Sequence, residues 1–169
     1  MFYLMIKCKK GYKMASMGKV EVNVKMCEEI EVVKCVISDG CYLPIRAHDT
    51  DAGFDLRTPK RVIIPAHGSA VIDTGVSVEI PKYFYGKLES KSGLMCKHDV
   101  VCPGGVIDCG YTGTIAVKLF NYGHDDYIFE KGDKIVQLLI IPCALSNVKV
   151  VLSLEDTERG DNGFGSTGK

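Results

Sequence analysis

Apolar and polar residues alternate along most of the chain from residue 29 onward, which is the pattern of half-buried β-strands. The alternating runs are short, and turn-forming stretches such as SDG, PAHG, NYGHDD and EKGD separate them. The predicted strands cover residues 29–37, 61–65, 70–81, 84–89, 113–121, 126–130, 134–144 and 147–154. No segment keeps a helical period, and only residues 88–98 are expected to hold a short turn of helix. Many short strands at regular spacing predict an all-β sandwich or barrel.

The chain divides into three parts by pattern. Residues 1–28 mix apolar residues with lysines and show no clear period, so we expect a flexible extension there. Residues 29–158 show no internal repeat or linker and predict one domain, which a chain of 169 residues is long enough to supply with a core. The opening MFYLMI is too short for a signal-peptide core, and no run approaches the length of a membrane span, so we expect no membrane partner.

Charge and cysteine content exclude two further classes. The 21 basic and 21 acidic residues cancel, so there is no bulk positive field to hold a nucleic-acid polymer. A small anionic nucleotide needs only local charges. The eight cysteines show no CxxC and no paired zinc spacing, which argues against a zinc site. Because several of them lie in apolar runs, we expect a reducing, intracellular location, with the cytoplasm first and the nucleus also open.

The stretch GVIDCGYTGTIAVKLFN, residues 105–121, concentrates candidate chemistry. The apolar pair Val106 and Ile107 ends on the carboxylate of Asp108, a glycine-bearing turn follows, and a strand then resumes. Turn residues between two apolar runs predict a β-hairpin. The acid and the ring of Tyr111 at its mouth suit a water and a flat ligand lying side by side. A surface turn with a capping Asp and a packing Tyr explains the same stretch equally well.

The C-terminal stretch RGDNGFGSTGK, residues 159–169, favours the ligand-binding interpretation. Its four glycines cannot pack a core because each one costs extra backbone entropy to order, and a disordered terminus is the usual outcome. Along this scaffold, however, Arg159 can pair with phosphate oxygens and Phe164 can stack on a base, while free backbone amides surround an anion. The stretch therefore predicts a flexible arm that orders over a nucleoside phosphate.

Five motifs now stand in order along the chain. They are DAGFDL (51–56), ESKSGLM (89–95), GGVIDCGYTG (104–113), GDKIVQL (132–138) and RGDNGFGSTG (159–168). Each alone is a weak signal, but five at this order and spacing form a strong one, and the chain resembles the trimeric dUTP pyrophosphatases (dUTPases) from about residue 44 to residue 169. The resemblance implies a distorted jelly-roll-like β-barrel, a homotrimer, and hydrolysis of dUTP to dUMP and pyrophosphate. That reaction limits uracil incorporation into DNA and supplies dUMP for dTMP synthesis.

The resemblance also implies residue roles. Asp108 becomes the general base that activates a water for attack on the α-phosphate, and Asp55 helps to hold the water shell of Mg²⁺. Backbone groups of residues 105–116 recognise uracil, Tyr111 stacks under the deoxyribose, and the arm closes over a site built partly by neighbouring subunits. The implied substrate-binding residues are Lys91, Ser92, Gly93, Gly105, Val106, Ile107, Asp108, Tyr111, Ala116, Gln137, Arg159, Phe164, Gly165 and Ser166. From the residues alone, Gln137 can also be a polar group satisfied inside the core.

The chain departs from the family pattern at one motif. The family usually has Pro-Arg-Ser-Gly where this chain has Ser90, Lys91, Ser92 and Gly93, and lysine keeps the charge but loses the bidentate fork of arginine. Glu89 is also unusual so near a triphosphate.

Two alternatives share the fold. One is a dCTP deaminase, whose general acid/base Glu falls where this chain has Lys118. The other is a non-catalytic nucleotide-sensing module, which would not need Asp108. A P-loop ATPase is excluded because no GxxxxGK[ST] follows any strand. Pyrophosphate release from dUTP separates an enzyme from a sensor.

Overall fold

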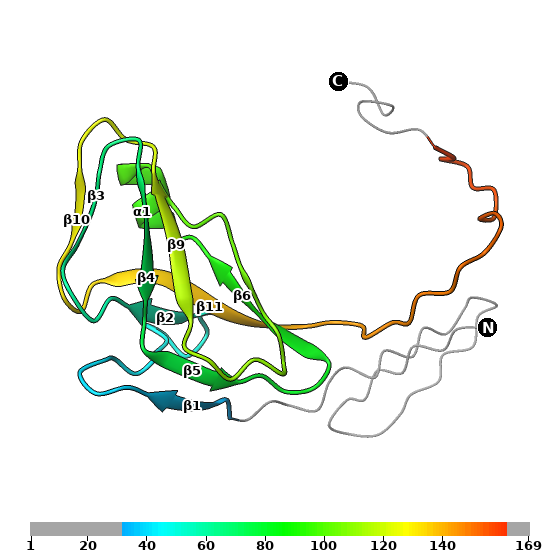
Figure 1. Cartoon of the computed structure of the whole chain (residues 1–169), viewed down its shortest axis with the longest axis horizontal. Coiled ribbons are helices and arrows are strands. Elements are labelled where there is room, and N and C mark those ends of the chain that lie inside the picture. The colour runs from blue at the N-terminus through cyan, green and yellow to red at the C-terminus, as the bar shows by residue number, and fades with distance from the viewer. Residues whose placement is uncertain (1–31, 162–169) are drawn as a thin grey trace.

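The computed structural model describes residues 32–161, which form β-strands with one short helix (Figure 1). The elements are β1 (Lys34–Ile37), β2 (Phe54–Arg57), β3 (Val62–Ile64), β4 (Ser69–Asp73), β5 (Val76–Glu79), β6 (Phe84–Glu89), α1 (Ser92–His98), β7 (Val100–Val101), β8 (Val106–Ile107), β9 (Ala116–Asn121), β10 (Tyr127–Phe129) and β11 (Lys134–Pro142). The all-β prediction is confirmed, and so is the short helix within residues 88–98.

Within residues 32–161 the strands form four antiparallel sheets. The largest has the order β2-β11-β6-β8, a second has the order β4-β9-β7, and β1-β5 and β10-β3 form pairs. The four sheets do not join through hydrogen bonds into a closed barrel. They pack instead around one shared core.

The core draws side chains from all of the larger sheets. Leu56 on β2, Ile72 on β4, Val117 on β9, Phe129 on β10 and Leu138 on β11 are each about 1% exposed or less. Each large apolar side chain buried in this way contributes about 1.5–3 kcal/mol. The core holds β2, β11 and β6 in fixed register, and these strands carry the candidate site.

Three predictions from the sequence are wrong. The single strand expected over residues 70–81 is two strands, β4 and β5, because the chain turns at Gly75, whose φ is +66°, and the two strands join different sheets. Residues 147–154 form no strand, and Val148, Val150, Leu152 and Leu154 are 86–108% exposed, because their alternating apolar side chains meet no partner strand in the single chain. The predicted hairpin around Asp108 is also absent, since β8 pairs with β6 whereas β9 pairs with β4 and β7. The run of two residues before the turn is too short to direct β8 onto β9.

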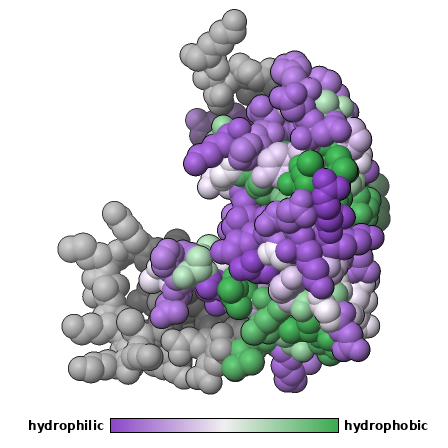
Figure 2. Space-filling view, turned by 90° about the vertical axis from the view of Figure 1, so that its left-hand side faces the viewer, coloured by the Kyte–Doolittle hydropathy of each residue, from purple (hydrophilic) through white to green (hydrophobic). Residues whose placement is uncertain are grey.

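The described end of the chain leaves the body of the protein. Figure 1 shows the segment after β11 extending away from the sheets, coloured orange to red. Apolar side chains also gather in patches on the otherwise largely hydrophilic face of Figure 2. Among residues 32–161, no helix combines the length and apolar character that crossing a bilayer requires.

Candidate functional site

An open cavity of about 310 Å³ lies where β2, β11 and the start of α1 meet. Its lining is mostly polar. The lining side chains with charge or hydrogen-bonding capacity come from three of the five motifs: Asp51, Asp55, Lys91, Ser92, Lys134 and Gln137. We call this cavity the Asp55 pocket.

Asp55 is the carboxylate with which both lysines of the pocket pair. It is the second residue of β2, it lies opposite Gln137 of β11, and its backbone N–H donates to the carbonyl of Ile45 at 2.8 Å. The residue is only 5% exposed, so its side chain is directed inward. A buried carboxylate is costly unless cations or donors surround it.

Two lysines provide that compensation. Lys91 Nζ donates to Asp55 Oδ1, and Lys134 Nζ lies 2.6 Å from Asp55 Oδ2. Burial alone would raise the pKa of Asp55, but the hydrogen bonds and charges of Lys134 and Lys91 outweigh it and hold that pKa below its ordinary value. The group of three carries one net positive charge. The carboxylate of Asp51, which accepts from the His48 amide at 3.0 Å, also lines the pocket and balances that charge.

A β-bulge explains how Lys134 reaches the pocket. Side chains three residues apart on a regular strand point to opposite faces, so Lys134 and Gln137 would not share a face. Between Lys134 and Val136 the register of β11 against β2 shifts, and consecutive Ile135 and Val136 are both buried. The bulge therefore directs Lys134 and Gln137 to the same side. Sequence reasoning missed Lys134 for this reason: strict alternation places it away from Gln137.

Gln137 ties β11 to the segment that carries Lys91. Its Nε2 donates to the Ser90 carbonyl at 3.1 Å, and a side-chain atom at Gly53 would lie only 2.9 Å from its Oε1. The alternative of an amide satisfied inside the core is thus partly right, because the group is hydrogen-bonded, but it also lines the pocket.

Ser90 fixes the same segment from the other side. Its hydroxyl donates to the Cys102 carbonyl at 3.0 Å and accepts from the Cys102 amide at 2.9 Å. The departure from the usual proline therefore brings two hydrogen bonds that hold the approach to Lys91. This pair of bonds restrains the backbone immediately before α1.

The structure also accounts for Glu89. Its carboxylate lies 2.6 Å from Lys87 Nζ, and Glu89 is not among the residues that line the pocket. The hydrogen bond from Lys87 is the main cause that holds the pKa of Glu89 below its ordinary value. The negative charge of Glu89 is therefore paired on the sheet surface and does not face an anion bound in the pocket.

The second candidate region is the turn of residues 108–113, which we call the Asp108 turn. Asp108 is exposed at the end of β8, and its carbonyl accepts from the Tyr111 amide at 3.0 Å. The Tyr111 hydroxyl donates to the Thr114 carbonyl at 2.9 Å, and its ring packs so closely over Gly113 that a Cβ there would lie 2.6 Å from the hydroxyl. Tyr111 is 45% exposed but held in one orientation.

The remaining predicted residues of this motif surround the turn. The Gly105 carbonyl accepts from the Leu88 amide at 3.0 Å, Val106 and Ala116 are exposed, and Ile107 is 8% exposed.

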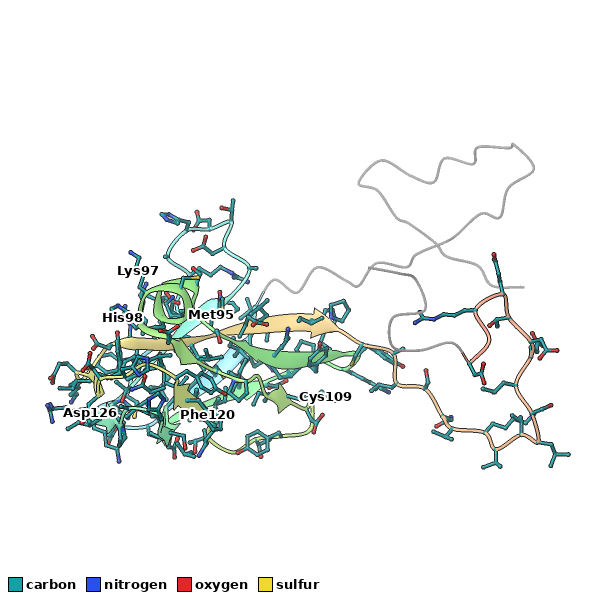
Figure 3. All side chains as sticks on the ribbon, turned by 90° about the horizontal axis from the view of Figure 1, so that it is seen from above. Met95, Lys97, His98, Cys109, Phe120 and Asp126 are labelled. Atoms are coloured by element: carbon teal, nitrogen blue, oxygen red, sulfur yellow. The ribbon has the colours of Figure 1, made fainter. Side chains whose placement is uncertain are left out.

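The two regions are separated within one chain. On β6, Gly86 faces Ile107 whereas Glu89 faces Gln137, and two strand spacings lie between β8 and β11. Asp108 is thus about 13 Å along the strands and about 10 Å across them from Gln137. Figure 3 shows Cys109, the neighbour of Asp108, well apart from Met95, Lys97 and His98 of α1. Within one chain the Asp55 pocket and the Asp108 turn are therefore two separate regions.

The predicted arm lies largely beyond these regions. Arg159 is in the exposed segment after β11, while Phe164, Gly165 and Ser166 fall outside the described residues. In residues 32–161, no cluster of three or more His, Cys, Asp or Glu side chains forms a metal cage. One buried carboxylate, Asp55, beside an open polar cavity nevertheless fits a magnesium ion that keeps most of its waters.

Comparison with known proteins identifies the family. The family model "dUTPase" matches residues 40–168. The chain belongs to the dUTPase family. A deoxyuridine 5'-triphosphate nucleotidohydrolase of Paramecium bursaria Chlorella virus 1 is 42% identical over 125 residues, which are 74% of this chain and 89% of that protein.

Solved dUTPase structures have the same fold. A Staphylococcus bacteriophage 80alpha dUTPase mutant with dUpNHpp superposes with a TM-score of 0.77 at 30% identity, covering 82% of this chain and 99% of that one. A mutant dUTPase from phage phi11 of S. aureus, described with a structural Mg(II) ion, has a TM-score of 0.70 at 28% identity, covering 74% and 99%.

Proposed function

We propose that this dUTPase-family chain hydrolyses dUTP to dUMP and pyrophosphate, which limits uracil incorporation into DNA and supplies dUMP for dTMP synthesis. The observation that carries the proposal is the Asp55 pocket, where two lysines flank one buried carboxylate beside the Ser92 hydroxyl, in a chain whose family model covers residues 40–168. Relatives named deoxyuridine 5'-triphosphate nucleotidohydrolase and a phage dUTPase solved with dUpNHpp support the same substrate.

The pocket is the phosphate-binding part of the proposed site. Lys91 supplies positive charge, and the Ser92 hydroxyl and the backbone amides of Ser92 and Gly93 supply donors on one wall, with Gln137 on the other. Magnesium, carried in on the triphosphate, would neutralise charge that builds on the phosphate oxygens. Asp55 would hold water molecules of its hydration shell, because a carboxylate oxygen accepts hydrogen bonds and is already oriented by the lysines.

The Asp108 turn is the catalytic part. Asp108 is exposed, so its carboxylate is free to accept a proton from a water molecule as the water oxygen bonds to the α-phosphorus. The bond between that phosphorus and the bridging oxygen breaks, and pyrophosphate leaves. A positioned general base of this kind contributes roughly a hundred- to ten-thousand-fold to the rate.

The same turn carries the selectivity for uracil and deoxyribose. The ring of Tyr111 is held by its bond to Thr114 and its packing on Gly113, so it forms a rigid platform for the sugar. A ribose 2'-hydroxyl would collide with that platform. Backbone groups of residues 105–116, including those of Gly105, Val106, Ile107 and Ala116, offer donors and acceptors to the edge of uracil.

The separation of the two regions supports a homotrimer with shared sites. Because Asp108 cannot reach the Asp55 pocket of its own chain, a complete site needs the Asp108 turn of a neighbouring subunit. The exposed apolar residues of segment 145–154 support this assembly, since Val148, Val150 and Leu152 need a partner surface. The arm of residues 159–169, with Arg159, Phe164, Gly165 and Ser166, would then close over a site built by other subunits.

A nucleotide panel tests the proposal. Purified protein with Mg²⁺ should convert dUTP to dUMP and pyrophosphate far faster than it converts UTP, dCTP or dTTP, with the products identified by chromatography. Ammonia release from dCTP would favour the deaminase alternative, although Lys118 is exposed on β9 where that reaction requires a carboxylate. Tight dUTP binding without any turnover would favour the sensor.

A further inference from the structure

We propose that Lys134 is a positioning residue that holds Asp55 in the free protein and exchanges this partner for the triphosphate when the magnesium nucleotide enters. The inference rests on the proposed function and adds a residue to its binding site. It starts from one juxtaposition: the bulge in β11 places a second ammonium group on a carboxylate that Lys91 already pairs.

The charge arrangement is the first reason. Asp55 needs one cation to balance it, yet both of its oxygens have a lysine partner, with Lys134 Nζ 2.6 Å from Oδ2. Each oxygen already has an ammonium group on it, so a metal-bound water competes with a lysine for the same carboxylate, and movement of one lysine opens a position for that water. The ammonium group of the second lysine is therefore available to an incoming anion.

The freedom of Lys134 to move is the second reason. Its side chain is 32% exposed and borders both the Asp55 pocket and a neighbouring cavity lined by Arg57, Tyr127 and Asp133. Lysine carries a compact charge on a flexible stem, so its ammonium group can turn from a carboxylate to a phosphate without backbone movement. In the exchange, one ion pair to Asp55 is replaced by one to phosphate, and the freed Asp55 oxygen accepts from a metal-bound water. Lys134 and Asp55 therefore each keep a partner after the exchange.

The expected result is a loss of triphosphate affinity when the charge is removed. Lys134→Met should weaken binding of the magnesium complex of dUpNHpp about ten- to hundredfold, the effect of one hydrogen bond to a charged group. Binding of dUMP, which lacks the outer phosphates, should change only a few-fold. Lys134→Arg should retain most of the affinity because it keeps the charge. Lys131→Met is the matched control: an exposed lysine on the preceding turn, outside the pocket, that should bind as the wild type does.

Isothermal titration of each folded variant with dUpNHpp and with dUMP, alongside its melting temperature, tests the inference. Wild-type affinity for dUpNHpp in Lys134→Met overturns it. An equal loss for dUpNHpp and dUMP with a lowered melting temperature also overturns it, because a merely structural ion pair gives that pattern. If Lys134→Met does not fold, Lys134→Gln supplies the neutral comparison. A wild type that binds dUpNHpp with this Lys134 dependence but does not hydrolyse dUTP refutes the proposed function alone, whereas a wild type that does not bind dUpNHpp refutes both.

Discussion

Substitution of Gly53 by alanine tests the close packing of Gly53 against Gln137, two residues that line the Asp55 pocket. A Cβ at position 53 would lie 2.9 Å from Gln137 Oε1 and 3.0 Å from Gln137 Cβ, so the Gln137 side chain must retreat by about 0.5 Å to reach ordinary contact. The bond from Gln137 Nε2 to the Ser90 carbonyl, now 3.1 Å, would then stretch beyond hydrogen-bonding range. The segment that carries Lys91 would lose one of its anchors.

The magnitude follows from these two changes. A lost hydrogen bond costs about 1 kcal/mol and local overpacking about 1–3 kcal/mol, so we expect a total of about 2–4 kcal/mol. For a chain of this size, each kcal/mol lowers the melting temperature by roughly 2–4 °C. We also expect a raised KM for dUTP, because Lys91 is less well positioned.

Thermal denaturation and steady-state hydrolysis of dUTP measure both effects. Gly93→Ala is the stability control on the same pocket, since nothing lies within 4 Å of an added Cβ there, and it should melt no lower than the wild type. The double variant Gly53→Ala/Gln137→Ala should be less destabilised than the sum of the single variants, because both remove the same bond. A Gly53→Ala protein with wild-type melting temperature and KM would refute this account of the pocket.

Three further predictions concern single residues. Asp108→Asn should retain binding of magnesium dUpNHpp but hydrolyse dUTP about a hundred- to ten-thousand-fold more slowly, and near-wild-type turnover would end the general-base assignment. Tyr111→Ala should hydrolyse UTP more readily relative to dUTP; an unchanged preference for deoxyribose in competition assays contradicts the steric role. Since Lys134 and Lys91 hold the pKa of Asp55 below its ordinary 3.8, the stability that this pairing contributes is complete above pH 3.8 and is lost as pH falls through the lowered pKa. The melting-temperature difference between wild type and Asp55→Asn should thus persist from pH 8 to pH 5 and shrink below pH 3.8; a difference that disappears at pH 5 would argue against the lysine pairing.

Most of the strands predicted from the sequence are present. Residues 84–89 form β6 as expected, and the apolar run of residues 134–144 contains β11. The strand β2 was not predicted, because its residues Asp55 and Leu56 are adjacent and both buried, which breaks strict alternation. Residues 147–154 do alternate, but a strand also needs a neighbour, and a single chain offers none at that position.

The sequence predicted most of the residues that form the candidate site, but it did not predict how they are arranged in space. Asp55, Lys91 and Gln137 were predicted from their motifs and do line one pocket. Lys134 was not predicted, because a β-bulge interrupts the alternation of the strand and the sequence pattern does not mark its position. The separation of Asp108 from that pocket also depends on the order of β11, β6 and β8 in the sheet, which motif order along the chain does not specify.

The most direct test of the central claim, dUTP hydrolysis at sites shared between subunits, is a mixed-trimer experiment. Asp108→Asn chains lack the general base, and chains lacking residues 159–169 lack the arm, so trimers of either kind should be nearly inactive. Co-expression should restore dUTP hydrolysis to at most on the order of a quarter of the wild-type rate, because random assembly combines an intact Asp108 with another chain's intact arm in that fraction of sites. Mixed trimers that form but remain as inactive as either parent would contradict the shared site.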